Sequence, residues 1–200
     1  MTDRAMGPTG RRRGRGAREQ ILGAARRLFE SDGMTRSGMD AVAREAGVSK
    51  RTVYQHFPTK GDLLVAYLAT RDLDQEPWDL DPSLGPREQI LAVFTAEPET
   101  PGGLTPMCPF VRAAVEISDD GHPARDVVRR YKVGVADRFR ELARAAGAED
   151  PGALGEQLAL LLDGAAARTR ALGDESIPTA AAIARTLLDA AIPENAGARS

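Results

Sequence analysis

The sequence predicts an all-α fold, with a small basic helical module at the N-terminus and a larger helical domain behind it. Apolar residues recur with the period of an amphipathic helix through most of the chain. No stretch alternates apolar and polar residues convincingly enough to indicate a strand. Clusters of proline and glycine separate the periodic segments, as expected for turns between helices.

Residues 1–17 are rich in glycine and arginine and contain almost nothing to bury, so we expect a disordered basic arm. The arm either contacts DNA, along the phosphates or in a minor groove, or is a solvated tail. The first helical face begins near Arg18, and Gly33 provides a left-handed stop. The apolar members of this face are Ile21, Leu22, Ala25, Leu28 and Phe29.

Three short helices are predicted next. Ser37 is the expected N-cap of the first, which ends at Gly47 in a tight turn. Ser49 caps the second, Pro58 stops it, and Thr59 caps the third, which runs to residue 68. Two short helices joined by a glycine-containing turn form a helix-turn-helix. The residues expected to face inward are Met39, Val42, Ala43, Ala46, Val53, Phe57, Leu63, Leu64, Tyr67 and Leu68.

The helix after Ser49 has an outer face that suits a DNA groove. Val53 and Phe57 hold it inward, which leaves the polar residues between them outside. Arginine and lysine bind guanine or phosphate, glutamine binds adenine, and threonine contacts the thymine methyl group. Hydroxyls and cations at helix starts suit phosphate. The predicted DNA-binding residues are Ser37, Lys50, Arg51, Thr52, Tyr54, Gln55, His56 and Lys60.

The charge of the chain is divided unevenly. Residues 1–60 contain 13 Lys and Arg against 6 Asp and Glu, a net charge of +7. The remaining residues contain 14 against 23, a net charge of −9, which gives −2 in total. A basic front and an acidic back favour a nucleic-acid-binding module joined to another domain, with chance scatter as the alternative.

Residues 18–68 resemble the DNA-binding domain of the TetR family of transcriptional regulators. The shared patterns are A…LF…G in the first helix, DAVAREAGVS in the second helix and turn, and TVYQHFPTK in the third helix and its exit. Met34 stands where the family often has an aromatic residue, and Gly61 where it often has an acidic one. The resemblance implies a homodimer, a palindromic operator and a C-terminal domain that usually binds a small effector and releases DNA.

We predict an effector-binding and dimerisation domain at 69–193 and a disordered tail at 194–200. Helices are expected at about 87–96, 109–118, 123–146, 153–172 and 178–191. The last two carry apolar and small residues that either pack as a four-helix bundle between two subunits or face the core of their own subunit. The bundle placement is also what the resemblance implies. The predicted dimer-interface residues are Leu158, Leu162, Ala165, Ala166, Ile183 and Leu187.

Candidate effector contacts are apolar. They line a cavity between helices or form a packed core, and they are Phe94, Met107, Phe110, Phe139 and Leu161. The run around Cys108 and Phe110 resembles the start of the sixth helix in many TetR-family members. Cys108 is either a redox or electrophile sensor or a buried, inert thiol.

The composition limits the class of protein further. The chain lacks the roughly 18-residue apolar run of a membrane span and an apolar signal-peptide core. Its single cysteine excludes an internal disulfide and fits a reducing compartment, so we expect a cytoplasmic protein. The sequence contains no nucleophile-elbow, Walker, dinucleotide-binding or zinc-ligand motif. We therefore expect no enzyme, no catalytic residue, no metal site and no cofactor.

The sequence as a whole predicts a dimeric, sequence-specific DNA-binding transcriptional regulator. We expect a repressor that a small-molecule effector releases from a palindromic operator. The alternative is a DNA-binding dimer without a small-molecule effector, either constitutive or controlled by another protein.

Overall fold

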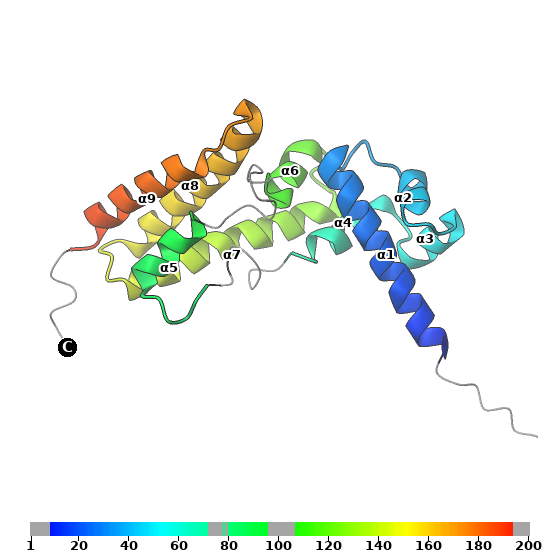
Figure 1. Cartoon of the computed structure of the whole chain (residues 1–200), viewed down its shortest axis with the longest axis horizontal. Coiled ribbons are helices and arrows are strands. Elements are labelled where there is room, and N and C mark those ends of the chain that lie inside the picture. Colours follow the sequence, from blue (N-terminus) through cyan, green and yellow to red (C-terminus); the bar gives the residue numbers. More distant parts are fainter. Residues whose placement is uncertain (1–8, 72–77, 79, 96–106, 194–200) are drawn as a thin grey trace, which may run out of the picture. The chain divides into compact units, whose positions relative to one another are not determined.

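The computed structural model describes residues 9–71, 78, 80–95 and 107–193, and all regular secondary structure within these ranges is helical (Figure 1). The predicted all-α class is therefore confirmed, while the predicted tail at 194–200 lies outside the described residues. In the described ranges, every helix is too short or too polar to cross a lipid bilayer. The helices are α1 (Thr9–Ser31), α2 (Met39–Glu45), α3 (Lys50–His56), α4 (Lys60–Leu68), α5 (Pro86–Val93), α6 (Pro109–Glu116), α7 (Pro123–Ala145), α8 (Pro151–Leu172) and α9 (Ile177–Ala191).

The first helix begins earlier than the sequence predicts. Order is expected from Arg18, after a disordered arm at residues 1–17, but α1 begins at Thr9. Arginine is a good helix former, and the extension of an existing helix needs no new nucleus. The stretch predicted as a disordered arm therefore overlaps α1 at residues 9–17, and residues 1–8 lie outside the described residues.

The chain divides into two compact units. Unit 1 comprises Met1–Thr70 with Ala113–Val127, and unit 2 comprises Arg71–Arg112 with Val128–Ser200. The predicted domain limit after residue 68 is close to the first of these divisions. The end of α6 and the start of α7, predicted for the second domain, nevertheless belong to unit 1, because α6 ends in a carboxylate that bonds to the α1–α2 turn.

The core of unit 1 forms where α1 packs against α2, α3 and α4. The ring of Phe29 meets the ring of Tyr67 edge-on, with 5.3 Å between the centroids, and both side chains are buried. Helical spacing places Ile21 and Ala25 on the same buried face of α1, as the apolar pattern predicts. The other helices contribute Val42, Ala43, Val53, Phe57, Leu63, Leu64 and Leu68.

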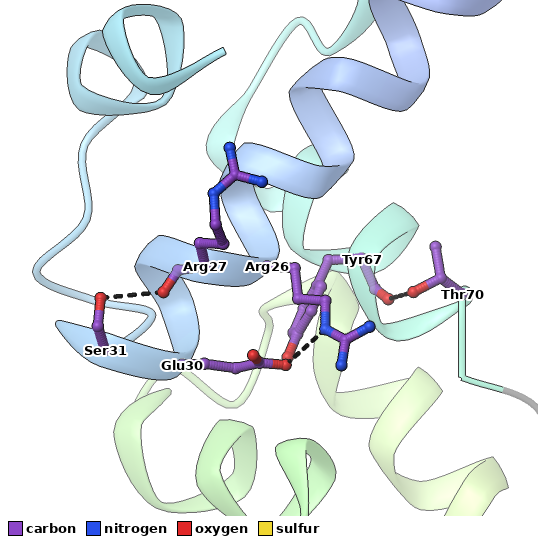
Figure 2. Close-up of polar contacts among 6 residues, drawn as sticks. All are labelled: Arg26, Arg27, Glu30, Ser31, Tyr67 and Thr70. Carbon is purple, nitrogen blue, oxygen red and sulfur yellow. Dashed lines mark hydrogen bonds and ion pairs between the residues drawn. The ribbon is translucent and has the colours of Figure 1, made fainter. Parts of the chain in front are cut away.

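Polar side chains reinforce the ends of α1 and α4 (Figure 2). The Ser31 hydroxyl donates to a carbonyl one turn earlier in α1, at 2.9 Å. The Thr70 hydroxyl donates to the carbonyl of Tyr67 at 2.6 Å. These bonds lie in the last turns, where intrahelical partners run out. On the exposed side of α1, Arg26 and Glu30 form an ion pair at 3.0 Å.

Unit 2 has an aromatic core to which α5, α7, α8 and α9 contribute. The ring of Phe139 lies between two others, 4.9 Å from Trp78 in an edge contact and 5.9 Å from Phe94 in a stacked contact. The last two helices lie side by side in Figure 1. Gly173 ends α8 with φ 68°, and the backbone N–H of Ser176 donates to the buried Thr169 hydroxyl at 3.0 Å. These contacts fix the α8–α9 hairpin.

Candidate nucleic-acid interface

The two helices of the motif are joined by a turn that requires glycine. Gly47 has φ 65°, a left-handed conformation that side chains with a Cβ disfavour. The N–H of Val48 then bonds back to the carbonyl of Ala43 at 3.1 Å. The turn therefore sets the direction in which α3 leaves α2, as the sequence predicts.

The ends and the inner face of α3 also agree with prediction. The Ser49 hydroxyl accepts the N–H of Thr52 at 3.1 Å, which confirms the N-cap. Val53 is 0% exposed and Phe57 is 3% exposed, so both anchor the helix. The cap and the two anchors fix which residues of α3 remain outside.

The outer face of α3 presents groups that suit DNA. Arg51, Tyr54 and Gln55 are exposed, while Thr52 and His56 are half-buried. Within the described residues, the side chains of Arg51 and Gln55 form no hydrogen bond or ion pair. Both side chains can therefore bind base edges without first breaking an internal bond.

Lys50 also lies on this face, but its ammonium is already paired. Its Nζ lies 2.7 Å from the Asp40 carboxylate of α2. The hydrogen bond with Asp40 and the charge of Asp40 raise the pKa of Lys50. Binding to a phosphate would exchange one exposed anion for another, so the net gain is small.

Lys60 bonds within its own subunit, at the start of α4. Its Nζ donates to the carbonyl of Thr35, in the α1–α2 turn, at 2.7 Å. Burial lowers the pKa of Lys60, and the charge of Glu116 partly opposes that effect. The predicted Thr59 cap is confirmed as a reciprocal box with Asp62. The ammonium of Lys60, which was expected to bind a DNA phosphate, therefore donates to a backbone carbonyl in this structure.

The prediction for Ser37 is wrong. The N-cap of α2 is Gly38, which has no side chain to cap with. Ser37 is only 4% exposed, and its hydroxyl donates to the carbonyl of Gly33 at 2.7 Å. This bond closes the turn from inside, and Gly33 has a left-handed φ of 97°. The N-cap role predicted for Ser37 therefore falls to Gly38, and the Ser37 hydroxyl is engaged inside the turn.

Sequence reasoning missed two cations beside this motif. Arg18 is exposed, and its guanidinium carbon lies 5.3 Å from the centroid of the Phe57 ring. Arg36 is exposed in the α1–α2 turn. Arg36 could have been found from the sequence, because it is a cation two residues before Gly38, at the start of a helix. The contact of Arg18 with Phe57 joins residues far apart in sequence, so no local pattern indicates it.

The predicted effector contacts lie in packed surroundings in unit 2. Phe94 and Phe139 are buried in the aromatic core, and the half-buried Leu161 packs against the same cluster. Phe110 is buried and stacks on Tyr131, with 3.6 Å between ring centroids. The fifth predicted residue, Met107, is half-buried just before α6.

A small polar group adjoins these aromatic residues. Lys132 of α7 forms a half-buried ion pair with Asp163 of α8. Its Nζ also lies 3.5 Å from the Cys108 sulfur. The ion pair joins α7 to α8, and the thiol is half-buried rather than fully enclosed.

Tyr131 yields a pH prediction. Burial raises its pKa to about 12, and the charge of Cys108 adds to this effect. Because the pKa of Tyr131 in the folded protein lies above the ordinary tyrosine pKa of 10.0, the stability contribution is complete below pH 10 and is lost as the pH rises towards 12. In urea titrations between pH 9 and 11.5, we expect the unfolding free energy to fall more steeply in the wild type than in Tyr131→Phe. Parallel curves would contradict this assignment.

The predicted dimer residues are divided between the core and the surface of unit 2. Leu158 is 0% exposed within its own subunit, and Ala165 and Ala166 are also buried. Leu162 and Leu187 are half-buried. Large apolar side chains are exposed instead at Ile183, which was predicted, and at Leu160 and Leu172, which were not.

The comparisons with known proteins agree on the class of the chain. A family model described as "Bacterial regulatory proteins, tetR family" matches residues 21–67. A crystal structure of a tetR transcriptional regulator from Streptomyces avermitilis is 36% identical and has a TM-score of 0.72, covering 88% of this chain and 97% of that one. The TetR-family regulator SCO4454 from Streptomyces coelicolor is 27% identical and has a TM-score of 0.74, covering 90% and 97%.

A curated relative points the same way. The HTH-type transcriptional regulator YjdC from Escherichia coli is 28% identical over 158 residues, which cover 76% of this chain and 82% of the relative. All three named relatives are transcriptional regulators rather than enzymes.

Proposed function

The chain belongs to the TetR family of transcriptional regulators, and we propose that it acts as a cytoplasmic homodimer that represses transcription from a palindromic operator. In this proposal a small-molecule effector bound by unit 2 releases the DNA. The observation that carries the DNA-reading part is the outer face of α3, where Arg51 and Gln55 are exposed and unpaired within the described residues.

Each exposed residue of α3 has a proposed role. Arg51 and Gln55 suit base edges, because a guanidinium binds guanine and a carboxamide binds adenine in two-bond geometries. Tyr54 suits phosphates, which position the helix without reading sequence. Lys50 reaches a phosphate only by exchanging its ion pair with Asp40. The half-buried pair, Thr52 and His56, suits contacts at the margin of the groove.

We expect Arg51→Ala or Gln55→Ala to weaken binding of the specific duplex about tenfold, because each removes one base contact. The duplex is recovered from a random-sequence pool with the wild-type protein. Binding is then measured by fluorescence anisotropy on this duplex and on a shuffled one. Arg144→Ala, which removes an exposed arginine from α7, is the matched control and should change neither affinity.

Equal weakening on both duplexes would contradict base reading. It would mean that the two side chains contact only the DNA backbone, which is the same for every sequence.

The proposal of a dimer is supported by the exposed apolar residues of unit 2. Leu160, Leu172 and Ile183 lie on α8 and α9, which pack side by side in one subunit. Two such pairs of helices form a four-helix bundle with little rearrangement. A dimer also supplies two recognition helices, whereas one short helix reads too few bases for a genomic site.

The effector response is tested separately from DNA binding. A panel of hydrophobic and cationic compounds is titrated into the complex of the protein with the selected duplex. We expect at least one compound to release DNA and to shift the melting temperature of the free protein. If no compound does either, the alternative of a DNA-binding dimer without a small-molecule effector is favoured.

A further inference from the structure

The α1–α2 turn is held by a side chain from a distant part of the sequence. Glu116, the last residue of α6, accepts the backbone N–H of Thr35 at 3.0 Å and lies 3.4 Å from its hydroxyl. On the other side of the same residue, the carbonyl of Thr35 accepts Nζ of Lys60 at 2.7 Å. Thr35 is therefore bonded through both backbone groups, to an anion from α6 and a cation from α4.

The fit around the carboxylate is close. A Cβ built on Gly33 would lie 3.2 Å from both carboxylate oxygens of Glu116, so the turn approaches this side chain with little free space. The turn is also closed from inside by the Ser37 hydroxyl, which bonds to the Gly33 carbonyl. Two of these bonds reach the turn from other elements, α6 and α4, while the Ser37 bond lies within the turn, and together they limit its movement.

The bond between Thr35 and Lys60 joins the two ends of the helix-turn-helix. Thr35 precedes α2, and Lys60 opens α4, so the two residues bracket the whole helix-turn-helix. We infer that Glu116 is a positioning residue for DNA binding. By holding Thr35 in place beside Lys60, it fixes α2 and α3 relative to α4. The inference goes beyond the proposed function and does not depend on an effector.

A positioning role predicts the opposite sign from simple electrostatics. Removal of a carboxylate from a DNA-binding unit reduces repulsion from phosphates and should strengthen binding. Loss of a positioning bond should weaken it, because α3 then samples orientations that do not match the groove. The direction of the change therefore separates the two roles.

The test compares Glu116→Ala with Glu116→Gln in the full-length protein. The probes are the duplex selected from a random pool by the wild type and a shuffled duplex of the same length. We expect Glu116→Ala to lose about five- to tenfold in affinity for the selected duplex, the range of one lost hydrogen bond. Glu116→Gln keeps an acceptor oxygen and should stay within about twofold of the wild type.

The control is Glu141→Ala, which removes an exposed carboxylate from α7 and should leave affinity unchanged. Far-UV circular dichroism at the binding temperature gives the folded fraction, by which active concentrations are corrected. The inference is overturned if Glu116→Ala binds as tightly as the wild type or more tightly. It is also overturned if Glu116→Gln loses as much as the alanine variant.

A second variant tests whether the bonds of Glu116 and Lys60 to Thr35 act on the same turn. Lys60→Met removes the bond on the other side of Thr35, and it should weaken selected-duplex binding on its own. In the double variant, the two losses should be clearly less than multiplicative, because both substitutions release the same turn. Fully multiplicative losses would show independent roles and would overturn the inference.

Discussion

Leu160→Arg is expected to convert the protein from dimer to monomer and to lower affinity for the selected duplex by roughly 100-fold or more. Leu160 is 76% exposed in the subunit and lies in the middle of α8. In a bundle of α8 and α9 from two subunits, arginine at this position would bury an unpaired charge in an apolar contact, which is strongly unfavourable. A monomer then loses the second recognition helix, and with it half of the base contacts.

Val115→Arg is the matched control for this substitution. Val115 is 79% exposed, which is close to Leu160, but it lies on α6 in unit 1. Molar mass is measured by light scattering after size-exclusion chromatography, and affinity by anisotropy. A Leu160→Arg protein that remains dimeric, with normal affinity, would show that α8 does not form the interface.

The sequence predicts the starts of α3 and α4 well because the signals there are local. Ser49 and Thr59 cap helices through bonds to residues only three positions away. The left-handed conformations of Gly33 and Gly47 likewise depend on the residue itself. These caps and glycine conformations depend little on how distant parts of the chain pack.

The wrong predictions arise where a local sequence pattern is compatible with two different structures. Ser37 and Gly38 are both acceptable N-caps, and a buried carbonyl decides in favour of Gly38 by engaging the serine hydroxyl. The helix α8 contains so many leucines that its apolar pattern is compatible with more than one buried face. Packing against α7 and α9 places Leu158 inside and Leu160 outside, a choice that sequence spacing alone leaves open.

The positioning contact of Glu116 has no sequence signal at all. The hydrogen bond joins residues 81 positions apart, and neither Glu116 nor Thr35 belongs to a recognisable motif. The bond between Lys60 and the Thr35 carbonyl cannot be predicted from the sequence either, because every residue has a backbone carbonyl and the residue type does not indicate which one accepts. Tertiary structure is needed to find residues that act on DNA binding without touching DNA.

A substitution at Gly155 tests how closely α7 and α8 approach each other. A Cβ at this position would lie 2.9 Å from the backbone nitrogen of Arg140 and 3.0 Å from the carbonyl oxygen of Ala136. Both atoms belong to the backbone of α7 and cannot rotate away as a side chain could. We expect Gly155→Ala to lower the unfolding free energy by about 2 kcal/mol, because the helices must separate to admit the methyl group.

Helix propensity alone predicts the reverse sign for Gly155→Ala, since alanine stabilises a helix interior by about 0.5–1 kcal/mol relative to glycine. Gly23→Ala in α1 isolates that effect, because its nearest neighbour is a flexible side-chain atom of Arg27 at 3.8 Å. Urea unfolding followed by circular dichroism should therefore show Gly23→Ala stabilised and Gly155→Ala destabilised. Stabilisation of both variants would contradict the close α7–α8 packing, because the same methyl group meets backbone atoms only at Gly155.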